Sequence, residues 1–316
     1  MSNKGVLIVN LGTPDQPEPA AVKRYLRRFL SDARVIDKPR WMWLPILHGI
    51  ILQTRPKKSA KLYQEIWREE GSPLLIYTKA QAKHLQELLP DRIVRYAMSY
   101  SDPLLGAALE DMIKLGVTDL VIIPLYPQYS VTTTATVFDQ AMRYFLQQNK
   151  IPSLHMIHAF HEHPRYISWL ADHIKQKLDE QKTIDMILFS YHGIPVSYVH
   201  KGDCYPVHCE QTTALVMEKV GDVPYQLTYQ SKFGPDEWLT PATDETMKRL
   251  PQEGIKHVLV VTPGFVADCL ETIEEIEGEN KAYFLDHGGE SFTYVHPFND
   301  DPALAGILKE LVENCS

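Results

Sequence analysis

The sequence is poor in cysteine and has no excess of positive charge, and both shortages exclude classes of protein. Its 316 residues include four cysteines, too few for a disulfide scaffold in a chain of this length. Asp and Glu number 40 against 32 Lys and Arg, so the net charge of −8 argues against binding nucleic acid through a basic surface. No Gly-x-Gly-x-x-Gly or Walker loop follows a predicted strand, so no nucleotide is expected.

Long apolar runs are also missing. Residues 1–5 pass into a strand-like segment without the apolar region of a secretory signal, which predicts a cytoplasmic protein. The most apolar segment, residues 41–52, would reach about 18 Å as a helix, against roughly 30 Å for a membrane core, and Pro45 interrupts it. Its Trp41 and Trp43, with basic residues after it, indicate an interfacial lip or a wall for a flat apolar ligand; core packing is the alternative.

Short apolar runs do occur, and they alternate with amphipathic segments along the chain. Val/Ile/Leu runs separated by helices are typical of parallel sheets covered on both faces. Because one core rarely exceeds about 250–300 residues, we expect two doubly wound α/β domains, residues 1–150 and 151–300, with the crossover near residues 148–152. The predicted strands are residues 5–11, 93–98, 119–124, 154–159, 185–191, 225–229 and 257–262; the predicted helices are residues 20–30, 60–69, 79–88, 103–114, 137–147, 164–177, 210–220, 244–249 and 268–277.

Four predicted strand exits have an unusual composition. They combine Gly or Pro with polar or aromatic residues, and lie at residues 10–14, 126–134, 190–195 and 262–271. Ligands of open α/β sheets bind where loops leave the carboxyl ends of strands. Turn chemistry alone explains any one of these loops, but four together favour a binding site.

Two of these exits carry groups that can transfer protons or bind metal. His192 stands beside Gly193 at a strand end, where a ligand can reach an imidazole that titrates near neutral pH. Asp268, Glu271 and Glu275 are spaced three and four residues apart, so on an α-helix they share one face. Such a carboxylate row can pass protons or hold a divalent cation, whereas an acidic first turn that complements the helix dipole would explain only Asp268 and Glu271.

Two further clusters give weaker signals. His158, His161 and His163 precede a helix that starts at Pro164, and their spacing fits neither one helix face nor one strand face, so we interpret them as surface histidines at a helix entry. Cys204 and Cys209 have four residues between them, too wide for the usual zinc or redox pair.

Several of these segments together resemble the ferrochelatase family, which inserts ferrous iron into a porphyrin as the last step of haem synthesis. Leu-Phe-Ser-Tyr-His-Gly-Ile-Pro at residues 188–195 resembles the motif around the family's active-site histidine. The matches span residues 7 to about 275, and their order and spacing agree with the family. The other matching segments are residues 7–14, 126–130, 230–235 with 238–239 and 243–245, and 265–268 with 270–272.

The resemblance implies two Rossmann-like, chelatase-type domains, each a parallel sheet flanked by helices, with the last helix (about residues 301–316) packing back on the first. It implies that His192 and Glu271 are the catalytic pair and metal ligands, and that Asp268 and Glu275 lie on a proton or metal path. Its implied substrates are protoporphyrin IX and Fe²⁺, and two protons are released. The implied porphyrin-binding residues are Leu11, Arg55, Tyr126, Trp238 and Phe265.

The segment at residues 41–52 falls at the family's apolar lip, and with the basic residues after it we expect a peripheral contact with the inner face of the cytoplasmic membrane, in a monomer or homodimer. Family members with a [2Fe–2S] cluster carry three cysteines in a C-terminal extension. Only Cys315 lies there, so no cluster and no permanently bound cofactor are expected. Ser99 replaces an arginine that often precedes Tyr100, and Cys269 replaces a common histidine, so no role carries over to either position.

Two alternatives stay open. Relatives that use coproporphyrin III tend to have a tyrosine where Leu11 stands and to lack the apolar lip, so Leu11 and residues 41–52 favour protoporphyrin IX. A non-catalytic tetrapyrrole or metal carrier on the same fold would not need both a base and a carboxylate row, so His192 with Glu271 argues against it.

Overall fold

The computed structural model describes residues 3–181 and 183–315, which divide into two compact units. The first unit contains the residues up to Ala159 and those from Asn299 onward, and the second is Phe160–Phe298. The division therefore follows Ala159, later than the crossover expected at residues 148–152. The reason is that strand β4 (Ser153–Met156) pairs with the sheet of the first unit before the chain leaves it.

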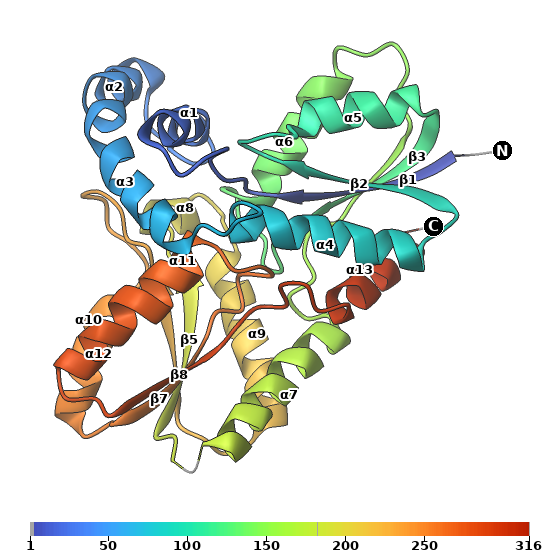
Figure 1. The fold of residues 1–316 in the computed structure, drawn as a ribbon. Coiled ribbons are helices and arrows are strands. Elements are labelled where there is room, and N and C mark those ends of the chain that lie inside the picture. Colours follow the sequence, from blue (N-terminus) through green and yellow to red (C-terminus); the bar gives the residue numbers. More distant parts are fainter. Residues whose placement is uncertain (1–2, 182, 316) are drawn as a thin grey trace. The chain divides into compact units, whose positions relative to one another are not determined.

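The first unit is built on a four-stranded parallel sheet with the order β2-β1-β3-β4. The helices α5 and α6 cover one face of this sheet, and α4 and α13 cover the other (Figure 1). Because both faces are covered, the middle of β1 is apolar at successive positions, and Val6 to Val9 are fully buried. The strands are β1 (Asn3–Asn10), β2 (Arg92–Met98), β3 (Val117–Pro124) and β4.

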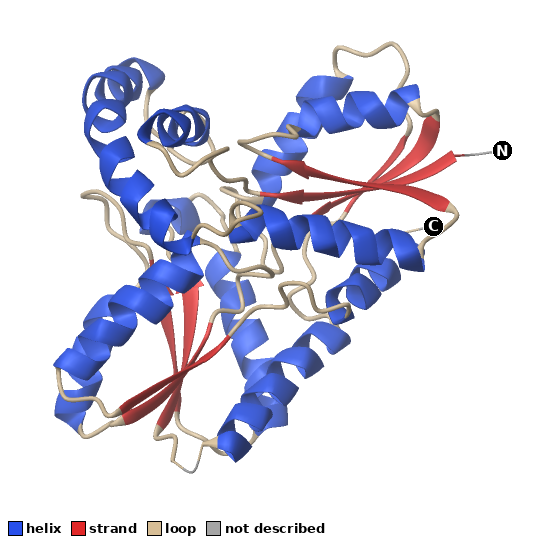
Figure 2. Ribbon diagram, in the orientation of Figure 1, coloured by secondary structure: helices blue, strands red, loops and turns tan. Residues whose placement is uncertain are grey.

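The second unit repeats this plan with the strand order β6-β5-β7-β8, again all parallel. Here α7 and α9 lie on one face of the sheet and α10 and α12 on the other (Figures 1 and 2). The predicted fold of two helix-flanked parallel sheets is therefore confirmed. The strands are β5 (Met186–His192), β6 (Tyr225–Gln230), β7 (His257–Val261) and β8 (Ser291–Val295).

The apolar segment at residues 41–52 forms neither one regular helix nor a core element. It comprises α2 (Arg40–Ile46), the π-helical turn η1 (Leu47–Ile51) and the start of α3 (Leu52–Ile66). Its side chains divide between two environments, because Leu47 and Leu52 are buried whereas Trp41 is 77% exposed. None of the helices in the described part of the chain is long and apolar enough to cross a bilayer.

The prediction omitted strand β8, the π-helical segments and several short helices, whose periodicity is too brief to read from sequence. The remaining elements are α1 (Pro19–Leu30), α4 (Pro73–Leu88), α5 (Leu105–Lys114), α6 (Thr134–Phe145), α7 (Pro164–Glu180), α8 (Val196–His200), α9 (Tyr205–Val220), α10 (Thr243–Arg249), η2 (Leu250–Glu253), α11 (Leu270–Thr272), η3 (Ile273–Asn280), α12 (Lys281–Asp286) and α13 (Ala303–Glu313).

Candidate functional site

His192 is the last residue of β5, at the carboxyl end of the second sheet, and its side chain is half-buried. Its ring Nδ1 lies 2.7 Å from the carbonyl oxygen of Gly193. A carbonyl oxygen can only accept a hydrogen bond, so in this arrangement Nδ1 carries the proton. The neutral imidazole therefore has its lone pair on Nε2.

The loop after His192 is held by a second loop that carries Trp238. Leu239 donates its N–H to the carbonyl of Ile194 at 3.1 Å, and Pro195 forms a bridge with Trp238. A Cβ atom at Gly193 would lie 2.9 Å from the Gln230 carbonyl oxygen and 3.1 Å from a carbon of the Trp238 ring, so only glycine fits between them. The half-buried indole of Trp238 is thereby fixed next to the histidine loop, and its N–H has no hydrogen-bond partner among the described residues.

The acidic segment is not the single α-helix that the spacing predicted. It has one short α-helical turn, α11, which continues as the π-helix η3. Asp268 precedes α11 and lies in the loop, and the Thr272 hydroxyl accepts the Cys269 N–H at 3.0 Å where the turn begins. The prediction that Asp268, Glu271 and Glu275 share one α-helical face is therefore wrong. Asp268 lies outside the helix, and the π-helix η3 does not have 3.6 residues per turn, so the three side chains do not line up on one face.

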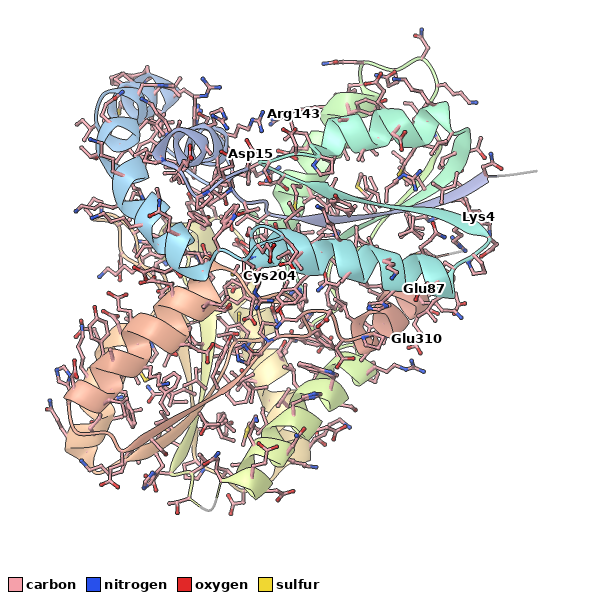
Figure 3. The ribbon with its side chains drawn as sticks, in the orientation of Figure 1. Lys4, Asp15, Glu87, Arg143, Cys204 and Glu310 are labelled. Atoms are coloured by element: carbon pink, nitrogen blue, oxygen red, sulfur yellow. The ribbon has the colours of Figure 1, made fainter. Side chains whose placement is uncertain are left out.

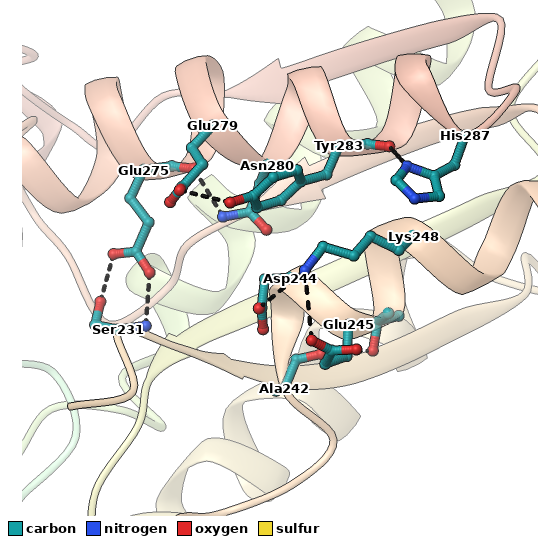
Figure 4. Close-up of polar contacts among 11 residues, drawn as sticks. Ser231, Ala242, Asp244, Glu245, Lys248, Glu275, Glu279, Asn280, Tyr283 and His287 are labelled. Atoms are coloured by element: carbon teal, nitrogen blue, oxygen red, sulfur yellow. Dashed lines mark hydrogen bonds and ion pairs between the residues drawn. The ribbon is translucent and has the colours of Figure 1, made fainter. Parts of the chain in front are cut away.

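Glu275 is held by Ser231, the first residue after β6. The Ser231 N–H donates to Oε1 at 2.6 Å and the Ser231 hydroxyl donates to Oε2 at 2.5 Å (Figure 4). Burial raises the pKa of Glu275 above its usual range, and the Glu271 charge adds to the rise, whereas the Ser231 bonds and the His192 charge oppose it. Glu275 is therefore within electrostatic reach of both His192 and Glu271.

Asp268 belongs to a separate cluster with His296, which follows β8. The Asp268 carboxylate is almost fully buried, accepts the Thr272 hydroxyl at 2.7 Å, and lies 2.9 Å from the Nδ1 atom of His296. This bond raises the pKa of His296 although partial burial lowers it, and Glu277 lies 3.6 Å from Nε2 on the other side of the ring. Sequence reasoning missed His296, because it stands outside every motif and directly after a strand that was not predicted.

The other expected site residues lie beside strand ends or on the helices of their own unit. In the first unit, Leu11 directly follows β1, Tyr126 follows β3 by two residues, and Arg55 is on α3; all three are half-buried. In the second unit, the half-buried Phe265 closes a turn after β7, with its N–H 3.1 Å from the Thr262 carbonyl.

The two positions that depart from the family pattern are occupied by buried residues. Ser99 is buried beside Tyr100, and its carbonyl accepts a bond from the Gln140 amide at 3.3 Å. The Tyr100 hydroxyl donates to Asp32 at 2.9 Å, and burial raises the pKa of this tyrosine well above its usual range. Cys269 is also buried, and burial likewise raises the pKa of its thiol. A buried neutral thiol is a poor nucleophile and a poor metal ligand.

The interpretation of three surface histidines is wrong for His161. This residue is buried, stacks on His208 with ring centroids 3.7 Å apart, and lies 3.0 Å from the Gln211 side-chain oxygen. Cys204, in the loop before α9 (Figure 3), is a free thiol 3.5 Å from His208. Within residues 3–181 and 183–315, no three His, Cys, Asp or Glu side chains are arranged to hold a metal ion.

Comparison with known proteins gives the family. The ferrochelatase family model matches residues 3–315. The chain is 52% identical over 312 residues to the coproporphyrin III ferrochelatase of Enterococcus faecalis, covering 99% of both proteins. It is 48% identical over 310 residues to the ferrochelatase of Pectobacterium atrosepticum, covering 98% of this chain and 97% of that protein.

Solved structures agree on the fold. SirB from Bacillus subtilis, solved with Fe³⁺, aligns with a TM-score of 0.60 at 12% identity, covering 99% of this chain and 96% of that one. CbiX, described as the terminal enzyme of sirohaem biosynthesis in denitrifying bacteria, aligns with a TM-score of 0.56 at 14% identity over 99% of both chains. At such low identity these two support the fold alone, whereas the family match and the close relatives cover the whole chain. This chain belongs to the ferrochelatase family.

Proposed function

We propose that this enzyme inserts Fe²⁺ into protoporphyrin IX and releases two protons, and that His192 and Glu271 are its catalytic residues. The proposal rests mainly on the hydrogen bond that fixes the ring of His192. Its Nδ1–H is bound to the Gly193 carbonyl, so in the neutral ring the lone pair lies on Nε2, and His192 is within electrostatic reach of the Glu275 carboxylate. A base and acidic groups at one strand end are what a metal-for-proton exchange requires.

The reaction needs two deprotonations and one metal transfer. Each of two pyrrole nitrogens loses its proton and gives the freed electron pair to iron, while iron gives up its previous ligands. His192 Nε2 is suited to accept a pyrrole proton. Glu275, whose pKa is raised by burial, is suited to take up that proton and pass it on. The carboxylate of Glu271 and Nε2 of His192 are also the ligands that would hold iron before the ring takes it.

Aromatic and apolar residues at the strand ends suit a flat macrocycle. Leu11, Tyr126 and Phe265 each follow a strand and each keep part of their side chain accessible. Trp238 adds an indole N–H that no described residue accepts, so it can donate to a bound ligand. We assign contacts with the porphyrin to these four residues, and a contact with a propionate to Arg55.

Coproporphyrin III is the second candidate substrate, because the Enterococcus faecalis relative that uses it is 52% identical to this chain. Coproporphyrin III carries four propionates, whereas protoporphyrin IX carries two propionates and two vinyl groups. The apolar Leu11 and the exposed apolar side chains of residues 41–52 support the less charged porphyrin. Anaerobic incubation of the enzyme with Fe²⁺ and each porphyrin, followed through the Soret band, tests the proposal. A higher kcat/KM for coproporphyrin III would exclude the first choice, and binding without metal insertion would indicate a carrier.

The region around α1–α3 supports a contact with an anionic membrane surface. Residues 19–61 contain eleven Lys and Arg but two Asp and no Glu, although the whole chain has a net charge of −8. Four apolar side chains of the same region are exposed: Trp41 at 77%, Met42 at 49%, Ile46 at 42% and Ile50 at 58%. Apolar side chains surrounded by cations are typical of a surface that inserts shallowly among anionic lipids. We therefore propose peripheral binding at the inner face of the cytoplasmic membrane through this apolar lip.

A further inference from the structure

Gln230, the last residue of β6, joins the histidine loop to the acidic segment. It is 3% exposed, and its polar groups contact three different segments of the second unit. Its carbonyl accepts the Gly193 N–H at 2.8 Å, and its side-chain oxygen accepts the Ser190 hydroxyl at 2.8 Å. Its side-chain N–H₂ donates to the Glu271 carbonyl at 2.8 Å. The backbone and side chain of this one residue therefore link both sides of the site.

The next residue extends this link to the second carboxylate. Ser231 adopts a positive φ of 65°, which residues other than glycine rarely do, and this turn directs both its N–H and its hydroxyl at Glu275. Gln230 adds a longer bond of 3.3 Å to the same carboxylate. Backbone strain of this kind persists where the surroundings determine it, and it is concentrated at functional sites.

The bonds of Gln230 also continue into the core. Ser190 contacts the Thr243 hydroxyl at 2.9 Å, and Thr243 donates to Thr228 at 2.9 Å. All four side chains are buried, so a chain of hydrogen bonds from the core holds the Gln230 amide in one position. A rigidly held amide can fix the separation of two segments more precisely than a solvated one.

We infer that Gln230 and Ser231, here called the Gln230–Ser231 corner, are positioning residues that hold Glu271 and Glu275 in register with His192. The inference rests on the proposed function. The corner fixes Glu271 through its backbone carbonyl and Glu275 through its carboxylate, while the Gly193 N–H fixes the loop that orients His192. A shift of these groups by about 1 Å would lower the rate of the chemical step about 10-fold to 100-fold with little effect on porphyrin binding.

The test compares the variants Gln230→Met and Ser231→Ala with the control Thr212→Val. Methionine matches glutamine in length but cannot form its side-chain hydrogen bonds. Thr212→Val removes a buried 3.1 Å bond to the His161 carbonyl, away from the corner, and so reports on the general effect of losing a buried bond. Anaerobic turnover with Fe²⁺ and protoporphyrin IX gives kcat and KM, and thermal unfolding gives Tm.

We expect Gln230→Met to lower kcat about 10-fold to 100-fold while KM for porphyrin stays within about twofold, and Thr212→Val to lower Tm but keep kcat. Ser231→Ala, which keeps the backbone bond and therefore the fold, should show a smaller loss of kcat. Equal kcat values for the corner variants and the control would overturn the inference, as would a raised KM with unchanged kcat. If the wild-type protein itself inserts no metal, the proposed function fails first, and the inference fails with it.

Discussion

Nδ1 of His296 lies 2.9 Å from Oδ2 of the buried Asp268, at the base of the segment that carries Glu271. The bond to Asp268 raises the pKa of His296 above its unfolded value of about 6.5. The protonated ring therefore stabilises the fold fully below about pH 6.5, and this contribution is lost as the pH rises through the higher folded pKa. The pH dependence of stability should consequently depend on His296.

We predict that His296→Asn lowers Tm by several degrees at a pH of about 5.5 and by much less at about 8.5. Thermal unfolding across this range measures the difference. The control is His287→Asn, which alters an exposed histidine bonded to the Tyr283 carbonyl. A loss of Tm that is the same at every pH would show that His296 acts by packing and not by charge.

His192→Ala should lower turnover about 100-fold or more, because the variant loses the Nε2 lone pair that we propose as the acceptor of the pyrrole proton. Porphyrin binding, followed by fluorescence quenching, should persist since the aromatic residues remain. His200→Ala, which changes an exposed histidine at the end of α8, should behave as wild type. Near-normal turnover by a folded His192→Ala variant would exclude the assignment.

Glu271→Gln should reduce kcat about tenfold more than Glu275→Gln does. Glu271 lies in α11 and is proposed as an iron ligand and partner of His192, whereas Glu275 is bonded to Ser231 and is assigned a later step of the proposed proton path. Glu290→Gln, at an exposed position before β8, provides the control for removing one negative charge. Equal and small effects of both substitutions would leave the acidic segment without a catalytic role.

Serine at Trp41, Met42, Ile46 and Ile50 should reduce binding to anionic liposomes at least about tenfold and raise the KM for porphyrin, with Tm unchanged. All four side chains are exposed, whereas Leu47 is fully buried and is therefore left intact. The matched control replaces two exposed apolar residues elsewhere in the first unit, Met142 and Leu146, with serine. Liposome binding that falls equally in both variants would show that the apolar lip has no special affinity for membranes.

The sequence predicted the sheets well because buried parallel strands are continuous apolar runs, and such runs at β1, β3 and β5 have few alternative structures. It missed β8, where Ser291 and Thr293 alternate with aromatic residues, and so the position of His296 was not foreseen. The acidic segment was predicted as one α-helix because spacing alone cannot distinguish 3.6 residues per turn from the wider π-helix. Gln230 and Ser231 were noticed only as part of a motif, since their function depends on contacts with residues about 40 positions away.

The π-helix η3 makes the site depend on the length of the chain as well as on its residues. A π-helical turn takes up more residues than an α-helical one, so deleting one residue between Ile273 and Asn280 would let ordinary α-helical hydrogen bonds form. Because the π-helical turn already contains the extra residue, the segments before and after the deletion would keep nearly the same orientation, and only the wide turn itself would close. The turn that carries Glu275 would then lose the geometry that brings its carboxylate to Ser231, in a protein whose helix had become more regular. Under the proposed function, a shorter and better-bonded helix would thus give a less active enzyme, and selection for stability alone would be expected to remove this turn first.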